Sequence, residues 1–293
     1  MQYRLAVLDI DGTLLDSSGA IPHRVKEAVR AAHKRGCLVT LASGRRLSAI
    51  RGVAAELGLA TPLILCNGGL VYDLERETAL HAAALSPEAV AAAVHLIWEA
   101  GHQPVVYENP LQGERIFTGP LERQNAAAAH YFGRPHLNTV RLERNSLAAI
   151  VEPLLLTAMG EAAEIEALTL LVQRAGITCQ TLIEHQSFVP GSRWWQLDLM
   201  APGCSKGAAL LHLCEITGVR PAETLAIGDG INDLELIRAA GLGIAMGNAV
   251  AAVRGAAQVI VADNDHGGVA EALETHVLGL PGSRVRRESA PAQ

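Results

Sequence analysis

Apolar runs alternate with helix-like stretches at the start of the chain. Residues 3–8, 37–42 and 62–66 are apolar runs that predict buried strands. Between them, the spacing of apolar positions predicts helices at 22–35 and 46–57, each followed by a glycine. Strands that alternate with helices over short links are typical of parallel βαβ units, with helices on both faces of one sheet.

The same alternation returns after residue 204. Helices are predicted at 205–217, 232–240, 249–254 and 267–276, and strands at 223–229, 242–247 and 257–262. We therefore predict an α/β fold in which both ends of the chain build one Rossmann-like parallel sheet core, residues 1–81 and 197–280. Residues 281–293 are polar and rich in proline and glycine, and we expect a flexible tail there.

The middle of the chain, residues 82–196, follows a different pattern. The predicted elements are helices at 86–101 and 161–176 and strands at 103–108, 115–119, 153–159, 177–185 and 194–200. This order indicates an α+β domain inserted into the first one. The stretch 109–150 carries no motif that indicates a function.

Composition narrows the class of protein. A chain of 293 residues with 49% hydrophobic and 18% charged residues is long and apolar enough for two globular domains. The net charge of −6 argues against a nucleic-acid partner, because binding a phosphate backbone requires clustered cations. Neither a membrane-spanning apolar run nor a signal-peptide pattern is visible, so we expect a cytoplasmic protein without a membrane partner. The five cysteines are scattered, which favours reduced, buried thiols.

Polar segments follow several of the predicted strands. They are "DIDGT" (9–13), "LASGR" (41–45), "CSKGAAL" (204–210) and "IGDGINDLELI" (227–237). In open α/β sheets, ligands bind at the carboxyl ends of the strands. The sequence therefore predicts one site built from segments that are far apart along the chain.

Two carboxylates follow the first strand directly. Asp9 and Asp11 lie on one face if the extended backbone continues past Leu8. An aspartate with an ordinary pKa near 4 is an anion at neutral pH, so Asp9 needs no base to act as a nucleophile. Asp11 is placed to give a proton to a leaving oxygen. The alternative is a pair of solvated loop acids.

Asp229 and Asp233 add two more carboxylates to the predicted site. Two like charges about 4 Å apart repel each other by several kcal/mol at an effective dielectric constant near 20. A hard divalent cation offsets this repulsion, and Mg²⁺ suits carboxylates combined with phosphate and water. Asp233 also fits the simpler role of an acid at the start of a helix.

The remaining polar residues of these segments suit a bound phosphate. Ser43 offers a hydroxyl, Gly44 a backbone N–H, Asn232 an amide and Lys206 a positive charge where negative charge gathers. Two further residues, Arg45 and Asn67 of "CNGG", lie at neighbouring strand ends, and we expect them to face the mouth of the site.

These four segments resemble those of the haloacid dehalogenase superfamily of phosphohydrolases. The resemblance covers nearly the whole chain and is to the Cof-type branch, whose type II cap is inserted between the second and third segments. It implies a phosphatase that forms an aspartyl-phosphate, with Asp9 as nucleophile and Asp11 as general acid and base. It also implies Mg²⁺, held by the carboxylates of Asp9 and Asp229 and the backbone carbonyl of Asp11.

The resemblance assigns supporting roles as well. Asp233 is expected to hold Lys206 or a water beside the ion, and Thr13 to support the ligands. The cap, residues 82–196, is expected to close over the substrate and select it. The substrate is a small phosphorylated molecule, with sugar phosphates first and nucleotides or phosphorylated cofactors such as pyridoxal phosphate behind. The oligomeric state is not predicted.

Other functions stay open at this point. A non-catalytic sugar-phosphate-binding or regulatory protein could keep the same fold, and a phosphotransferase could use the same residues. A dehalogenase does not need Asp11, and a P-type ATPase has Lys-Thr in place of Ile10 and Asp11, so both fit less well. No GxGxxG motif follows the first strand, which disfavours a dinucleotide site.

Overall fold

The chain forms two compact units. The structure is a computed structural model that describes residues 2–119, 125–133, 137–147, 150, 152–185 and 194–280, so the predicted tail 281–293 lies outside the described residues. The core unit comprises Met1–Arg45, Ala49–Glu77 and Ser205–Gln293, and the inserted unit comprises Arg46–Ser48 and Thr78–Cys204. Assigning the inserted unit as a cap stays a prediction.

A parallel five-stranded sheet forms the centre of the core unit. Its order is β14-β13-β12-β1-β2. The strands are β1 (Leu5–Leu8), β2 (Leu38–Leu41), β12 (Thr224–Gly228), β13 (Leu242–Ala245) and β14 (Val259–Ile260). Leu8 pairs in register with Ile227 on one side and Leu41 on the other. All four residues of β1 are fully buried, as expected for a parallel strand covered on both faces. The parallel α/β core predicted from the sequence is confirmed.

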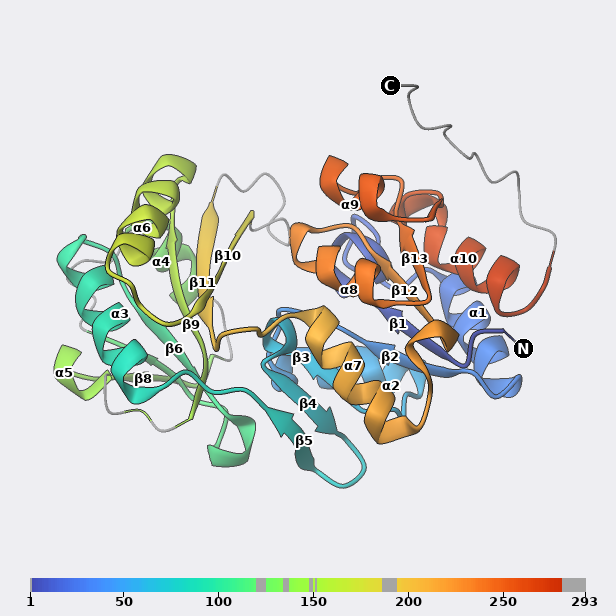
Figure 1. The fold of residues 1–293 in the computed structure, drawn as a ribbon, viewed down its shortest axis with the longest axis horizontal. Helices are drawn as coiled ribbons and strands as arrows, with labels where there is room; N and C mark the ends of the chain where they lie inside the picture. The colour runs from blue at the N-terminus through green and yellow to red at the C-terminus, as the bar shows by residue number, and fades with distance from the viewer. Residues whose placement is uncertain are drawn as a thin grey trace. The chain divides into compact units, whose positions relative to one another are not determined.

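Helices cover both faces of this sheet (Figure 1). On one face α1 (His23–Lys34) packs against α10 (Gly268–His276), and on the other α7 (Lys206–Thr217) packs against α8 (Leu234–Ala239). Two further helices are α2 (Leu47–Leu57), which follows β2, and α9 (Ala251–Ala256), which lies between β13 and β14 in the chain. Across the described part of the chain, every helix is too short or too polar to cross a bilayer.

A short hairpin extends the core unit beyond β2. The strands β3 (Leu63–Leu65) and β4 (Leu70–Asp73) pair antiparallel, and the turn between them is the 3₁₀ element Cys66–Gly68. A single parallel bridge joins Ala42 to Ile64, so β3 lies next to the end of β2. The sequence predicted β3 but not β4, which follows the tight turn directly. The chain then enters the inserted unit at β5 (Thr78–Ala82).

The inserted unit is built on a mostly antiparallel sheet of order β10-β11-β9-β6-β7-β8. The strands are β6 (Val105–Glu108), β7 (Ile116–Thr118), β8 (Thr139–Arg141), β9 (Pro153–Gly160), β10 (Gln180–His185) and β11 (Trp195–Met200). Neighbouring residues alternate between two apolar clusters: Val106 and Leu156 lie in one, Val105 and Leu155 in the other.

Helices flank this second sheet as well. The first cluster includes residues of α3 (Pro87–Glu99), α5 (Arg144–Leu147) and α6 (Ala162–Arg174), and the second includes α4 (Ala126–Phe132). The strand β8 and the helices α4 and α5 fall between the strands predicted at 115–119 and 153–159, where the sequence pattern predicted no element. Each of these elements has seven residues or fewer, too few for a clear periodicity.

Candidate active site

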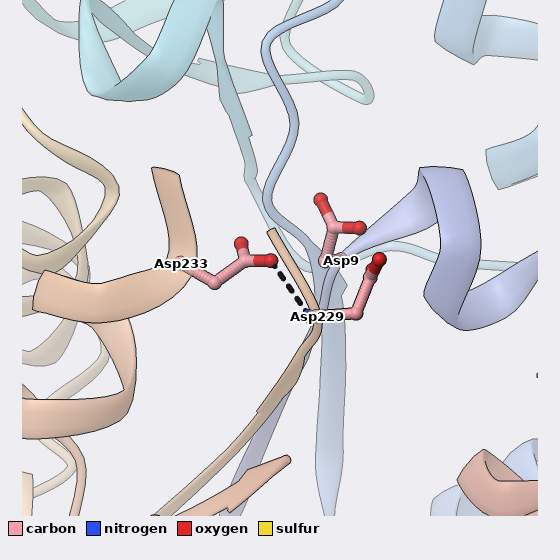
Figure 2. Close-up of side chains that lie close together, drawn as sticks. All are labelled: Asp9, Asp229 and Asp233. Carbon is pink, nitrogen blue, oxygen red and sulfur yellow. Dashed lines mark hydrogen bonds between the residues drawn. The ribbon is translucent and has the colours of Figure 1, made fainter. Parts of the chain in front are cut away.

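Three carboxylates meet at the carboxyl edge of the core sheet (Figure 2). Asp9 follows β1, Asp229 follows β12, and Asp233 closes the 3₁₀ turn Ile231–Asp233. One oxygen from each lies within 4.8 Å of the others. Asp9 is 4% exposed and Asp233 is fully buried. The parallel arrangement of β1 and β12 therefore produces a dense, buried negative charge.

A buried cation already lies within this cluster. The Nζ of Lys206 donates to Asp9 Oδ1 over 2.6 Å and to Asp233 Oδ1 over 2.7 Å. Lys206 is fully buried at the first position of α7, where Ser205 caps the helix by accepting from the N–H of Ala208. Burial by itself lowers the pKa of Lys206, but the attraction and hydrogen bonds of Asp233 and Asp9 together outweigh it and raise the pKa above its usual value. Lys206 is therefore charged.

One lysine does not neutralise three carboxylates. Burial raises the pKa of Asp9 well above its ordinary value, and Asp233 adds to the effect while Lys206 opposes it. Burial and then Asp233 also raise the pKa of Asp229 to about 7, against a hydrogen bond from Thr13. Burial and the neighbouring negative charge of Asp233 therefore both favour the protonated forms of Asp9 and Asp229. The oxygen donors and their excess charge fit a hard divalent cation.

Asp233 differs from the other two carboxylates. Its Oδ1 accepts from Lys206, and its Oδ2 accepts from the backbone N–H groups of Asp229 and Gly230, both over 2.9 Å. Both oxygens are therefore engaged by protein donors. Of the two roles considered for Asp233 beside a metal, the structure places it in contact with Lys206. Asp9 and Asp229 are the better candidates for direct metal ligands.

The backbone after β1 turns within the tight element Ile10–Leu14. Asp9 (φ −69°, ψ 166°) and Asp11 (φ −81°, ψ 114°) both have extended angles, and Gly12 has left-handed angles. Gly12 makes this turn possible, because its φ is +80° and an added Cβ would lie 2.4 Å from Asp229 Oδ2. The turn brings Thr13 Oγ1 to donate to Asp229 Oδ1 over 2.7 Å.

Asp11 lies outside the group of three and pairs with Arg45. The guanidinium Nε of Arg45 donates to Asp11 Oδ2 over 2.8 Å, and its Nη2 donates to Oδ1. The two side chains are 29% and 25% exposed, so the pair is only partly accessible to solvent. Arg45 was predicted from the sequence to face the mouth of the site, and its pairing with Asp11 was not foreseen.

The other predicted phosphate-binding residues line the same edge. Ser43 is 1% exposed, and its Oγ accepts from the N–H of Arg45 over 3.1 Å. Asn232 Nδ2 donates to Asn67 Oδ1 over 3.1 Å. An added Cβ on Gly44 would lie 2.9 Å from the same Asn67 oxygen, so the backbone of this loop lies directly against Asn67.

Sequence reasoning missed Asn248. This residue follows β13 in the turn after Gly247. Its Nδ2 donates to the carbonyl of Gly12 over 2.8 Å and approaches Asp229 Oδ2 at 3.5 Å. A polar residue directly after a predicted strand was the available signal, since the same rule identified Asp9 and Asp229.

Comparison with known sequences gives a consistent set of relatives. A family model described as haloacid dehalogenase-like hydrolase matches residues 6–273. The pyridoxal phosphate phosphatase YbhA of Escherichia coli is 29% identical over 95% of this chain and 100% of its own length. An HMP-PP phosphatase of Cronobacter sakazakii is 30% identical over 84% of this chain and 85% of its own.

Solved structures share the fold. A haloacid dehalogenase-like hydrolase from Bacteroides thetaiotaomicron superposes with a TM-score of 0.77 at 28% identity, covering 93% of this chain and 99% of its own. The subclass IIB sugar phosphatase BT4131 reaches a TM-score of 0.76 at 23% identity, over 93% of this chain and 98% of its own. The arrangement of a parallel sheet core with an additional sheet unit therefore recurs in these proteins.

Proposed function

The chain belongs to the haloacid dehalogenase-like hydrolase family and is an enzyme, and from this premise we propose that it is a Mg²⁺-dependent phosphatase of small phosphomonoesters. The observation that carries the proposal is the group of Asp9, Asp229 and Asp233 around the buried Lys206. Three carboxylates and a lysine in a buried edge position are costly to keep without a function that uses their charge.

Asp9, Asp229 and the backbone carbonyl of Asp11 are the groups that hold the metal in this proposal. Bound there, Mg²⁺ supplies positive charge that offsets the carboxylates and the phosphate of the substrate. The raised pKa values of Asp9 and Asp229 support this set, because burial and the charge of Asp233 destabilise both ionised carboxylates and a bound cation would offset that cost.

Asp9 acts as the nucleophile. Lys206 holds its Oδ1, so the side chain has one fixed orientation before the substrate binds. A carboxylate oxygen of Asp9 attacks phosphorus, the bond from phosphorus to the leaving oxygen breaks, and Asp11 gives that oxygen a proton. Water then attacks the phosphorus of the aspartyl-phosphate and loses a proton to Asp11, which releases inorganic phosphate and restores Asp9.

The phosphoryl oxygens are held by Ser43, the N–H of Gly44, Lys206 and the amide of Asn232. Lys206 supplies charge, and the neutral groups supply hydrogen bonds from fixed positions. Contacts from Arg45 and Asn67 to the substrate stay predictions, because in this structure the first holds Asp11 and the second accepts from Asn232. The inserted unit is proposed to select the leaving group.

The substrates of the relatives suggest which leaving groups to test first. Pyridoxal phosphate and HMP-PP appear in the names of two relatives, which moves phosphorylated cofactors up beside sugar phosphates. A panel of sugar phosphates, nucleotides and phosphorylated cofactors, ranked by kcat/KM, tests the assignment. Hydrolysis of p-nitrophenyl phosphate that is lost in EDTA and restored by Mg²⁺ is the expected result. Turnover that persists at full rate in EDTA would contradict the metal assignment.

Two other functions remain alternatives. A non-catalytic phosphate-binding protein would bind these compounds and release no phosphate. A phosphotransferase would pass the phosphoryl group to a second alcohol in preference to water. Measuring released phosphate and phosphorylated acceptor in the same reaction separates the three possibilities.

A further inference from the structure

The turn Cys66–Gly68 lies against three of the proposed catalytic segments. The N–H of Cys66 donates to the carbonyl of Arg45, and the N–H of Asn67 to the carbonyl of Ser43, both over 3.1 Å. These bonds tie the turn to the loop that carries the proposed phosphate ligands. They run backbone to backbone, so they fix the turn regardless of its side chains.

The backbone of this turn has an uncommon conformation. Cys66 has a φ of +51° and Asn67 a φ of +53°, so two successive residues with side chains adopt the left-handed region. Asparagine tolerates this region better than most residues, whereas cysteine rarely adopts it. Strained backbone of this kind persists where the surrounding structure determines it, often at functional sites.

Close packing holds the turn on its other side. Gly68 has a φ of +99°, and an added Cβ would lie 2.1 Å from the carbonyl oxygen of Ser205. Ser205 caps α7 directly before Lys206. The turn is therefore enclosed between the Ser43–Arg45 loop and the helix start that presents the catalytic lysine.

The side chain of Asn67 points toward a third segment, 227–237, which carries Asn232. Asn67 is 1% exposed, and its Oδ1 accepts from Asn232 Nδ2 over 3.1 Å. An asparagine side chain carries two N–H donors and one acceptor on the same amide. Because Asn67 Oδ1 accepts a hydrogen bond, the NH₂ end of the Asn232 amide faces Asn67. The second N–H of the same NH₂ group can then donate to another partner.

We infer that Asn67 is a positioning residue: it orients the amide of Asn232 for the phosphoryl group and does not itself bind the substrate. This inference rests on the proposed function of the site. It revises the role expected for Asn67 from the sequence, which was direct contact with the substrate. The strained turn after β3 is the means by which the side chain reaches Asn232 in the turn after β12.

Asn67→Gly isolates the side chain from the backbone, because glycine adopts the left-handed region without strain. We expect KM for p-nitrophenyl phosphate and the inhibition constant of inorganic phosphate to rise about tenfold, with kcat changed less than threefold. The melting temperature should stay within about 2 °C of wild type. Glu77→Gly is the matched control, since Glu77 also has a left-handed φ of +50° but lies on an exposed loop.

A double-mutant cycle with Asn232→Ala tests the route of the effect. If Asn67 acts through Asn232, Asn67→Gly has no further effect on KM once Asn232 is alanine. Additive effects would show that Asn67 contacts the substrate directly and would overturn the inference. Wild-type kinetics in Asn67→Gly, or a loss shared equally by Glu77→Gly, would overturn it too.

The same assays separate this inference from the proposed function. A wild-type protein that hydrolyses no phosphomonoester in the panel would refute the proposed function itself. An active wild-type protein with an unaffected Asn67→Gly variant would refute only the role of Asn67.

Discussion

The two sheets of this protein place their buried polar groups differently. In the parallel core sheet, β1 and β12 end at the same edge, so Asp9 and Asp229 come together from opposite ends of the chain. In the inserted unit, β9 and β11 run antiparallel, and their polar groups meet within the strands. There Thr157 Oγ1 donates to Asp198 Oδ1 over 2.6 Å, and both residues are buried.

The two sets of buried polar groups are expected to serve different purposes, one in catalysis and the other in stability. Carboxylates at the parallel edge repel one another and hold raised pKa values, so their arrangement serves a charged ligand better than it serves folding. A buried carboxylate inside a sheet accepts hydrogen bonds from neighbours such as Thr157 and Gln196, which stabilise the packed unit. Substitutions at the edge should therefore change activity most, and substitutions inside the second sheet should change stability.

The largest expected effect is at Asp9. Asp9→Asn removes the proposed nucleophile with almost no change in volume, and we expect turnover of p-nitrophenyl phosphate to fall at least about a thousandfold. Circular dichroism should show an unchanged fold. Asp16→Asn serves as a control, because Asp16 is a loop carboxylate whose hydrogen bonds go to its own turn. Turnover near the wild-type rate in Asp9→Asn would remove Asp9 from the mechanism.

Lys206 should combine both kinds of effect. Lys206→Met leaves buried carboxylates without their cation, and breaking a buried ion pair in this way costs about 3–5 kcal/mol. We expect a lower midpoint of urea denaturation and loss of turnover. Lys26→Met provides the comparison, because Lys26 pairs with Glu56 at the surface and such pairs contribute about 1 kcal/mol or less. An equal fall in the midpoint of urea denaturation in the two variants would contradict the importance of burial at Lys206.

Magnesium should stabilise the protein more at pH 8 than at pH 6. The pKa of Asp229 in the folded, metal-free protein is raised to about 7, above the unfolded value of 3.8. Its contribution to stability is therefore complete below pH 3.8 and is lost as pH rises through 7. Mg²⁺ binds the deprotonated carboxylate and restores stability where the proton has left.

The measurement is the shift in melting temperature caused by Mg²⁺ at the two pH values. Displacing the proton from Asp229 costs about 1.4 kcal/mol for each pH unit below its pKa. We therefore expect the shifts in melting temperature at pH 6 and pH 8 to differ by several degrees. Asp229→Asn should abolish both the shift and its pH dependence. A shift that is equal at the two pH values in the wild type would argue against Asp229 as a ligand.

The smallest effect is expected inside the second sheet. Thr157→Val keeps the volume but removes a donor to the buried Asp198, which costs about 1–3 kcal/mol. Turnover of p-nitrophenyl phosphate should stay close to wild type. Thr169→Val removes a hydroxyl that donates to the carbonyl of Ile165 within the helix α6, and its cost should be smaller. If Thr157→Val lowered turnover but left stability unchanged, the assignment of activity to the core sheet and stability to the second sheet would be contradicted.

Much of the fold was predictable from local pattern. The apolar runs at 3–8 and 223–229 became β1 and β12, because buried parallel strands are continuously apolar and short. Two elements that were not predicted are β4, which follows β3 directly through a tight turn, and α4, which has seven residues. The helix α4 packs against β9, which is more than twenty residues away in the sequence.

The site was predictable as a set of residues and not as a set of contacts. Asp9, Asp229 and Lys206 follow from the rule that strand ends share an edge. The pairing of Asp11 with Arg45 and of Asn67 with Asn232 does not follow from it, since both pairings depend on turns whose shape is set by close packing. Asn248 obeys the rule but was not considered.

The sequence alone determined which residue types stand at the ends of which strands, because strand ends can be read from the alternation of apolar and polar stretches. Only the tertiary structure decided that Lys206 bonds to both Asp9 and Asp233, and that Arg45 pairs with Asp11. The physical reason is range: apolar pattern acts over a few residues, whereas Lys206 and Asp9 are separated by 197 positions and meet only when the sheet and its helices have packed.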